Sequence, residues 1–191
     1  MSIPNEQLFL EAAKAGDLAV MKHLVTNSRL DVNWRSPRGL TPLVVACLKG
    51  DASMVDFLLR HPKLDVNKSH GGGFPPFFLA CEKDYKDVVS LLLADVRLNP
   101  NKPSDTGATP FLIASHYNHK EVVSLLLADM RVNVNQLNNE QLTPLWFASK
   151  NGHLSIVQLI LASVRDVDIK TKSIAGTSGW NNKTAAEIAR Y

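Results

Sequence analysis

The chain contains residue types that serve in metal binding and phosphate binding elsewhere, so their spacing decides what they can do here. Gly71, Gly72 and Gly73 form a glycine-rich stretch, but no Gly-Lys-Ser or Gly-Lys-Thr follows as in a phosphate-binding loop. His116 and His119 are close enough in sequence to approach one metal ion, yet no cysteine or second histidine pair stands at a ligand spacing. We therefore expect no bound metal and no cofactor, and we interpret the triple glycine as a turn.

The sequence supports nucleophilic catalysis no better than it supports a metal or phosphate site. No serine lies on a nucleophile-elbow motif, so a Ser/His/Asp triad has no candidate members. Cys47 and Cys81 are separated by 34 residues, and each comes at the end of an equivalent apolar segment. If they lie on stacked helices, whose axes are roughly 8 to 10 Å apart, they exceed the Cα separation of about 7 Å that a disulfide tolerates. The sequence thus predicts reduced core cysteines and a protein that is not an enzyme.

Composition narrows the classes of protein further. The 191 residues are 45% apolar and 20% charged, which is enough apolar material for a core. The apolar runs are far shorter than the roughly 20 residues that span a bilayer, and the N-terminus lacks the basic start of a signal peptide. We expect no membrane insertion and an intracellular location, cytoplasmic or nuclear. Basic and acidic residues alternate along most of the chain, and the net charge is +3, so no basic stripe for nucleic acid is evident.

The elements that position these residues repeat every 34 residues. Thr-Pro or Pro-Pro followed by an apolar segment begins at Thr41, Pro75, Thr109 and Thr143, and an atypical copy without Thr-Pro begins at Gln7. A threonine followed by proline predicts a helix start, because the hydroxyl caps free N–H groups and proline fits the first helical position. Self-similarity at this period indicates a row of stacked units whose neighbours bury one another's apolar faces.

Each unit has the pattern of two antiparallel helices and an extended arm. The first helix is expected to end in a left-handed turn at residues that tolerate positive φ, which are Gly16, Gly50, Asp84, Asn118 and Gly152. A second helix with one broad apolar face follows, and then an Asp-Val-Asn type arm leads to a tight turn. Gln141 stands where the other tight turns have Gly39, Gly73 and Gly107, which puts the geometry of that turn in question.

The unit resembles the ankyrin repeat, with its Gly-x-Thr-Pro-Leu-His-x-Ala, Gly-His, Val-x-x-Leu-Leu and Asp-Val-Asn motifs, over residues 5 to about 190. The histidine after Thr-Pro-Leu is replaced by Val44, Phe78, Leu112 and Trp146, which substitutes apolar packing for hydrogen bonds. The resemblance implies an all-α fold, a solenoid of stacked antiparallel helix pairs with β-hairpin-like fingers.

The resemblance also implies one domain, residues 1–191, with an altered C-terminal end. Lys183 to Arg190 looks like a displaced helix start, and Thr184 and Glu187 have the spacing of a capping box. We expect an elongated final loop, Thr171 to Lys183. The predicted repeats are approximately 5–38, 39–72, 73–106, 107–140 and 141–176, with a C-terminal cap at 177–191.

For function, the resemblance implies a monomeric, non-enzymatic protein–protein interaction module that presents a concave groove to a protein or peptide. The alternative is a regulatory or targeting fragment of a larger, enzyme-containing chain. Electrostatic binding to nucleic acid or acidic lipid is a third hypothesis, which the mixed charge does not favour.

Positions in the fingers and at the exposed ends of the first helices are free of the stacking constraint, so we expect them to contact the partner. These positions are Arg35, Arg38, Leu40, Leu48, Lys49, Phe74, Glu82, Lys83, His116, Tyr117, Glu140, Leu142 and Lys150, with Trp34 as an outlying finger-tip candidate.

The resemblance further implies that finger asparagines are substrates of an asparaginyl hydroxylase. Asn67, Asn101 and Asn135 each have a leucine eight residues upstream and are the candidate sites.

Overall fold

The predicted helix starts are present in the structure, a computed structural model that describes residues 4–26, 29–170, 184 and 187. The side-chain oxygen of Thr41 accepts a hydrogen bond from the backbone N–H of Val44, and Thr109 and Thr143 cap their helices in the same way. Pro75 takes the place of the threonine in one unit and supplies no side-chain cap. The Thr-Pro pattern therefore places these helix starts through capping, as expected.

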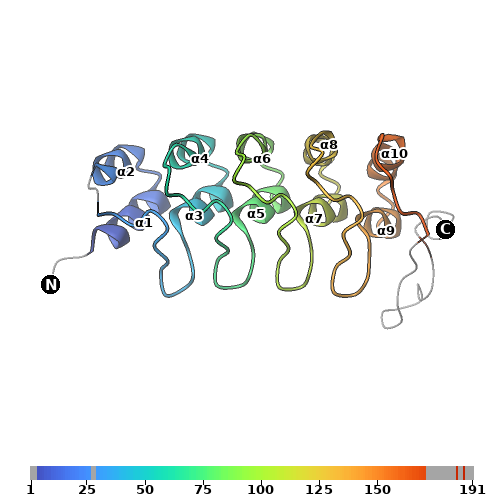
Figure 1. Cartoon of the computed structure of the whole chain (residues 1–191), viewed down its shortest axis with the longest axis horizontal. Coiled ribbons are helices and arrows are strands. Elements are labelled where there is room, and N and C mark those ends of the chain that lie inside the picture. The colour runs from blue at the N-terminus through green and yellow to red at the C-terminus, as the bar shows by residue number, and fades with distance from the viewer. Residues whose placement is uncertain (1–3, 27–28, 171–183, 185–186, 188–191) are drawn as a thin grey trace. The chain divides into compact units, whose positions relative to one another are not determined.

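Ten α-helices form five consecutive pairs in the described part of the chain, and no strand occurs there (Figure 1). The helices are α1 (Asn5–Ala15), α2 (Leu18–Val25), α3 (Pro42–Lys49), α4 (Ala52–Leu59), α5 (Pro76–Glu82), α6 (Lys86–Leu93), α7 (Pro110–His116), α8 (Lys120–Ala128), α9 (Pro144–Lys150) and α10 (Leu154–Ala162). None of the described helices is long and apolar enough to cross a membrane.

The two helices of each pair are joined at a residue with positive φ. The five predicted positions all adopt this conformation, with φ of 78° at Gly16, 68° at Gly50, 59° at Asp84, 62° at Asn118 and 69° at Gly152. Aspartate and asparagine tolerate the left-handed region better than most residues, which explains why they replace glycine here.

The extended arms end in hairpin-like turns without a strand ladder. In the first arm, the N–H of Ser36 donates to the carbonyl of Leu40, and that of Gly39 donates to the carbonyl of Ser36. Gln141 has a φ of 60° and its N–H donates to the carbonyl of Asn138, so the last described finger keeps the same turn without a glycine. We refer to residues 34–40, 68–74, 102–108 and 136–142 as the first to fourth fingers.

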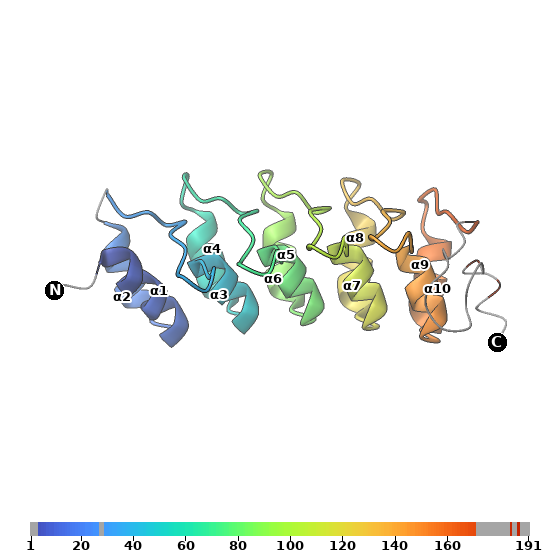
Figure 2. The same cartoon turned by 90° about the horizontal axis from the view of Figure 1, so that it is seen from below.

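Residue contacts divide the chain into two compact units, residues 1–99 and 100–191. In unit 1, α1 packs on α3, α3 on α5, and α4 on α6, so that α1, α3 and α5 run alongside one another (Figure 2). In unit 2, α7 packs on α9 and α8 packs on α10. Each helix pair thus buries its apolar face against the next pair within its unit.

The core consists of the faces where these helices meet. Cys47 and Cys81 are fully buried free thiols, and burial raises the pKa of both, which confirms their role as reduced core residues. Phe78 and Trp146, at the position of the ankyrin histidine, are buried as well.

At the C-terminal end, the capping box predicted for Thr184 and Glu187 is present. The N–H of Thr184 donates to the Glu187 carboxylate and the N–H of Glu187 donates to the Thr184 hydroxyl, which is the reciprocal pattern of a capping box. The predicted final loop, Thr171 to Lys183, lies outside the described residues.

Candidate functional site

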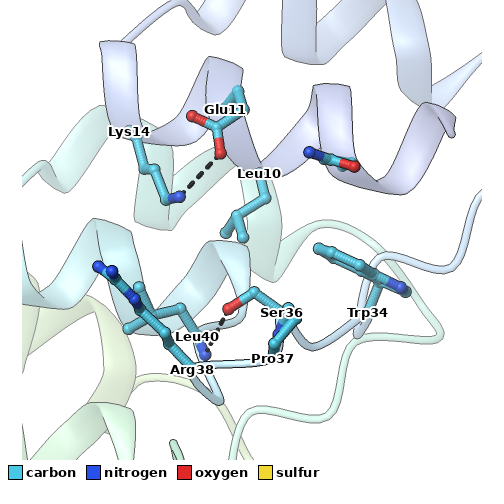
Figure 3. Close-up of a pocket in the computed structure, with 9 residues that line it drawn as sticks. Leu10, Glu11, Lys14, Trp34, Ser36, Pro37, Arg38 and Leu40 are labelled. Carbon is cyan, nitrogen blue, oxygen red and sulfur yellow. Dashed lines mark hydrogen bonds and ion pairs between the residues drawn. The ribbon is translucent and has the colours of Figure 1, made fainter. Parts of the chain in front are cut away.

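A hollow of about 590 Å³ opens in unit 1 between α1 and the first finger (Figure 3). We call it groove 1. It is lined by Gln7, Leu10, Glu11 and Lys14 of α1 and by Trp34, Ser36, Pro37, Arg38 and Leu40 of the finger.

The apolar part of groove 1 combines aliphatic and aromatic side chains. Leu10 is buried, while Trp34 and Leu40 are half-buried and keep part of their surface open to a ligand. The hydroxyl of Ser36 accepts a hydrogen bond of 3.2 Å from the N–H of Leu40, which braces the finger turn. Folding therefore holds this finger in place beside α1 before any partner arrives.

The charges of groove 1 leave one cation unpaired. Lys14 forms an ion pair of 2.8 Å with Glu11, so these two charges largely offset each other. Arg38 is exposed and has no ion pair among the described residues. The lining of groove 1 thus includes a guanidinium and an indole, and arginine and tryptophan are both enriched where proteins bind proteins.

In unit 2, aromatic side chains gather at the ends of α7 and α9. The His116 ring lies edge-on to Tyr117 and to Phe147, with centroid distances of 4.7 and 5.3 Å. Trp146 contacts Phe147, and the Lys150 ammonium lies 4.9 Å from the Trp146 ring centroid, within cation–π range. We call these five residues the aromatic cluster.

The surroundings of His116 favour its neutral form by lowering its pKa. Burial lowers its pKa, and the nearby charges of His153 and Lys150 lower it further. The side-chain amide nitrogen of Asn151 lies 3.0 Å from Nδ1 of His116, where it donates if that nitrogen is unprotonated. Nε2 of His153 lies 2.8 Å from the His116 carbonyl, so this histidine joins the end of α7 to the start of α10.

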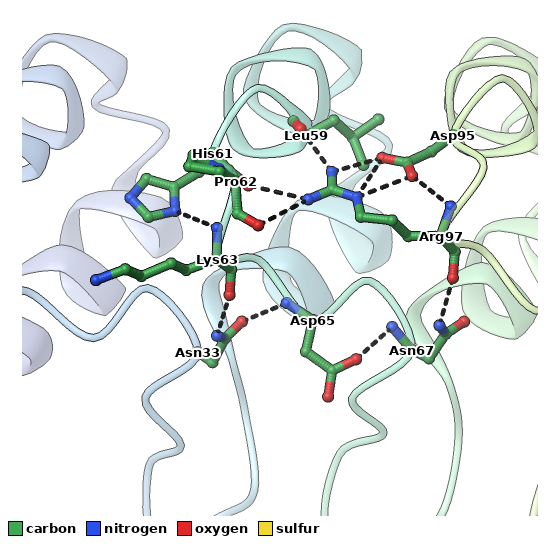
Figure 4. A network of polar contacts seen from close by, with 9 residues as sticks. All are labelled: Asn33, Leu59, His61, Pro62, Lys63, Asp65, Asn67, Asp95 and Arg97. Carbon is green, nitrogen blue, oxygen red and sulfur yellow. Dashed lines mark hydrogen bonds and ion pairs between the residues drawn. The ribbon is translucent and has the colours of Figure 1, made fainter.

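The extended arms that precede the fingers are joined to one another by asparagine side chains (Figure 4). The amide of Asn67 donates to the carbonyl of Arg97 at 2.8 Å, and its oxygen accepts from the N–H of Asn99 at 2.8 Å. Asn33 makes the same pair of bonds to the carbonyl of Lys63 and the N–H of Asp65. In unit 2, Asn101 and Asn135 repeat the arrangement. All three candidate hydroxylation sites therefore have side chains that fix the spacing between consecutive arms.

Comparison with known families decides the classification. A family model described as ankyrin repeats in three copies matches residues 9–104 and 96–173, which together span most of the chain. The chain belongs to the ankyrin-repeat family. A search of curated proteins gave no significant match. Ankyrin repeats are generally protein–protein interaction modules and are typically non-catalytic.

Within the ankyrin fold, the predicted contact residues of unit 1 separate into two groups. Arg38 and Leu40 come together in groove 1, with the outlying candidate Trp34. Arg35 instead donates to the carbonyl of Ser69 at 2.6 Å and joins the first two fingers. Lys49 donates to the carbonyl of Lys14 at 2.6 Å, at the end of α1. These two cations are thus already engaged in holding neighbouring repeats together.

The remaining predicted residues of unit 1 lie outside groove 1. Leu48 is half-buried. Phe74 stacks against His70 and Phe78 with centroid distances of 5.3 Å. Glu82 and Lys83 form an ion pair of 3.5 Å at the end of α5. These side chains remain candidates for contact, but they do not line a shared hollow with Arg38.

In unit 2, the structure brings His116, Tyr117 and Lys150 together in the aromatic cluster, and Tyr117 is 49% exposed. Glu140 is exposed at the tip of the fourth finger. Leu142 is a correction to the predicted contact residues: it is only 4% exposed, whereas its equivalents Leu40 and Phe74 are half-buried. A buried leucine offers a partner almost no surface.

The sequence prediction missed the half of groove 1 that α1 contributes. The missed residues are Gln7, Leu10, Glu11 and Lys14, together with Ser36 of the finger. The 34-residue period could have identified one of them, because Lys14 is one period before Leu48, which was a predicted contact residue. Among the described residues, no group of three or more histidine, cysteine, aspartate or glutamate side chains could hold a metal.

Proposed function

We propose that this ankyrin-repeat protein is a non-enzymatic binding module whose partner, a protein or a peptide, docks in unit 1 on the face formed by the fingers and the first helices of the pairs. Groove 1 is the principal anchor site in this proposal. The observation that carries it is the hollow of about 590 Å³ whose lining includes Trp34, Leu40 and the unpaired Arg38.

The contacts available in groove 1 suggest how a partner is held. An apolar side chain of the partner packs on Trp34 and Leu40, and a carboxylate beside it pairs with Arg38. Arginine and tryptophan commonly dominate binding energies when water is excluded from around them. Because the finger is already braced by Ser36 and by its neighbours, little conformational entropy is lost on association.

The test is a selection of displayed random peptides on the wild-type protein, followed by affinity measurements with Trp34→Ala and Arg38→Ala. Each substitution should weaken the selected peptides by about tenfold or more, as for a hot-spot residue. Lys86→Ala, an exposed lysine on α6, is the control and should leave affinity unchanged.

Equal affinities for wild type and both groove variants would show that groove 1 is not the anchor. A loss of binding in the Phe74→Ala/Tyr117→Ala double variant under those conditions would move the contact to other predicted positions.

We also infer, from the mixed charge, that the protein binds no nucleic acid. That it works as an intracellular monomer is a separate proposal. Complexes with a protein partner should respond weakly to an increase from about 50 to 200 mM salt, whereas nucleic-acid binding would weaken steeply.

Hydroxylation of Asn67, Asn101 and Asn135 is a separate proposal that rests on the family resemblance. Asn33 is the internal comparison, because it makes the same bonds but has Val25 eight residues upstream in place of leucine. Peptide mass analysis after exposure to an asparaginyl hydroxylase should show one added oxygen at the three sites. Unmodified masses at all three would refute the proposal.

A further inference from the structure

The outer side of unit 1 carries a second hollowed surface, away from groove 1. One hollow of about 400 Å³ includes Leu18, Lys22 and Asp56 in its lining, and a smaller one of about 180 Å³ includes Val25 and Pro62. Phe57 and Arg60 of α4 line both hollows, so the two form one surface along α2 and α4. We call it the outer surface.

Weak packing between α2 and α4 accounts for the outer surface. The helix α4 packs against α6, but α2 packs chiefly on α1 and makes far less contact with α4. Only Met21 of α2 is buried, whereas Met54, Val55 and Leu58 of α4 are. The seam between these two outer helices is therefore left open in the folded chain.

Comparison of α4 with the chain's other second helices indicates what stacking requires at this seam. The positions one, two and three periods after Phe57 are Leu91, Leu125 and Leu159. The positions after Arg60 are Ala94, Ala128 and Ala162. In these three later helices stacking is satisfied by leucine and alanine, whereas α4 has phenylalanine and arginine there and α2, one period earlier, has His23 and Thr26. Aromatic residues and arginine are both favoured at protein interfaces.

Charges flank the apolar part of the outer surface. Arg60 is 76% exposed, and its Nε and Nη2 both bond to one oxygen of Asp56, at 3.1 and 2.8 Å. Lys22 faces it from α2, is exposed and has no ion pair among the described residues. Two cations against one carboxylate leave an excess positive charge, which complements an acidic ligand.

The smaller hollow has the size and lining of a site for one side chain. Val25, Val32, Phe57, Leu58 and Pro62 make most of its wall. Apolar cavities of about 150 Å³ accommodate a benzene ring, so about 180 Å³ is enough for one leucine or phenylalanine side chain.

We propose that the outer surface is a second docking surface, which binds an acidic peptide segment of a partner protein by one bulky apolar side chain and adjacent carboxylates. The apolar side chain enters the hollow beside Phe57, and the carboxylates pair with Arg60 and Lys22. This surface is independent of groove 1, so the protein can hold two ligands at once.

The test uses the whole chain with Trp34→Ala and Arg38→Ala, which disables groove 1, as the target for a displayed library of random 12-residue peptides. Selected peptides should carry Asp or Glu next to one Leu, Ile, Phe or Trp. Their affinity should fall by about tenfold or more when Phe57→Leu and Arg60→Ala are added to the target.

Those two substitutions are ones the fold accepts, because the chain already has leucine and alanine at the equivalent positions. Far-ultraviolet circular dichroism should confirm that helix content is unchanged, and Lys86→Ala should leave affinity unaffected. The proposal is overturned if the selected peptides are not acidic, or if they bind the substituted and unsubstituted targets equally.

Co-sedimentation with vesicles of phosphatidylserine and phosphatidylcholine tests whether the outer surface binds an anionic membrane instead of a peptide. Vesicle binding that depends on Phe57 and Arg60, with no peptide showing that dependence, would assign the surface to lipid and overturn the proposal. Failure of groove 1 to bind any peptide would not affect this result, since groove 1 is already disabled in the target.

Discussion

Asparagine side chains in the extended arms connect each arm to the next by hydrogen bonds. Each of Asn33, Asn67, Asn101 and Asn135 both donates to and accepts from the backbone of the following arm. The asparagine amide carries an NH2 donor and a separate oxygen acceptor, so one side chain satisfies a carbonyl and an N–H at once. Replacement by a carboxylate would leave the carbonyl without a donor, because an ionised carboxylate only accepts hydrogen bonds.

Asn67→Ala should therefore destabilise the protein by about 1 to 3 kcal/mol, because it removes both bonds at a partly buried site. Urea unfolding followed by circular dichroism measures the change. Ser53→Ala, at an exposed position of α4, should be neutral. Equal midpoints for wild type and Asn67→Ala would mean that water replaces the amide without loss.

Gln141 shows the cost of a left-handed turn without glycine. Its φ of 60° is sterically unfavourable for a residue with a Cβ. Gln141→Gly should stabilise the protein by about 0.5 to 1 kcal/mol, after allowing for the greater freedom of glycine in the unfolded chain.

The matched control is Gly107→Ala in the preceding finger. Gly107 has a φ of 77°, and an added Cβ would lie 2.6 Å from the backbone nitrogen of Asn139. Thermal unfolding should show a lower midpoint for Gly107→Ala and a higher one for Gln141→Gly. A lower midpoint for Gln141→Gly would show that the glutamine side chain itself stabilises the finger.

At the scale of elements, threonine caps determine where several first helices begin. The Thr143 hydroxyl accepts from the N–H of Trp146 at 3.1 Å in a fully packed environment. Thr143→Val keeps the side-chain shape but leaves that N–H unpaired, so unit 2 should lose about 1 kcal/mol of stability. Ser90→Ala, an exposed change on α6, should have little effect in the same urea titration.

His116, at the end of α7, should make the free energy of unfolding depend on pH. The pKa of His116 is lowered from its usual 6.5, so the unfolded chain binds a proton there more readily than the folded chain does. Stability from this residue is complete above about pH 6.5 and falls as the pH drops through the lowered pKa.

Urea midpoints at pH 7.5 and pH 5.5 test this dependence. His116→Gln should reduce the difference between the two midpoints, while His23→Gln, at an exposed position of α2, should leave it as in the wild type. A wild-type difference that persists in His116→Gln would assign the pH dependence to other groups. His153 and Lys150 are the charges nearest to His116 and are unchanged in both variants.

At the scale of the whole molecule, stability should vary along the chain, because each pair contacts only its neighbours. Within unit 1, α4 buries three residues and packs on α6, whereas α2 buries one and packs chiefly on α1. Native-state hydrogen exchange should therefore give the amides of α4 about tenfold or greater protection over those of α2. Equal protection would mean that unit 1 opens as a single cooperative block.

The sequence by itself determined the helix pairs, their order and the left-handed turns. These features depend on local chemistry: a threonine hydroxyl reaches the N–H three residues on, and Asp84 or Asn118 tolerates positive φ wherever the turn is placed. The 34-residue period then made the packing of one pair on the next predictable, because the same apolar positions recur in each.

Only the tertiary structure decided which surface residues are available. Leu40, Phe74 and Leu142 occupy equivalent positions, yet Leu142 is buried and the other two are half-buried. Lys49 and Arg35 read as free cations in the sequence, but each reaches a carbonyl of a neighbouring repeat. Groove 1 and the outer surface arise where segments far apart in sequence meet, and no local pattern encodes how closely those segments pack.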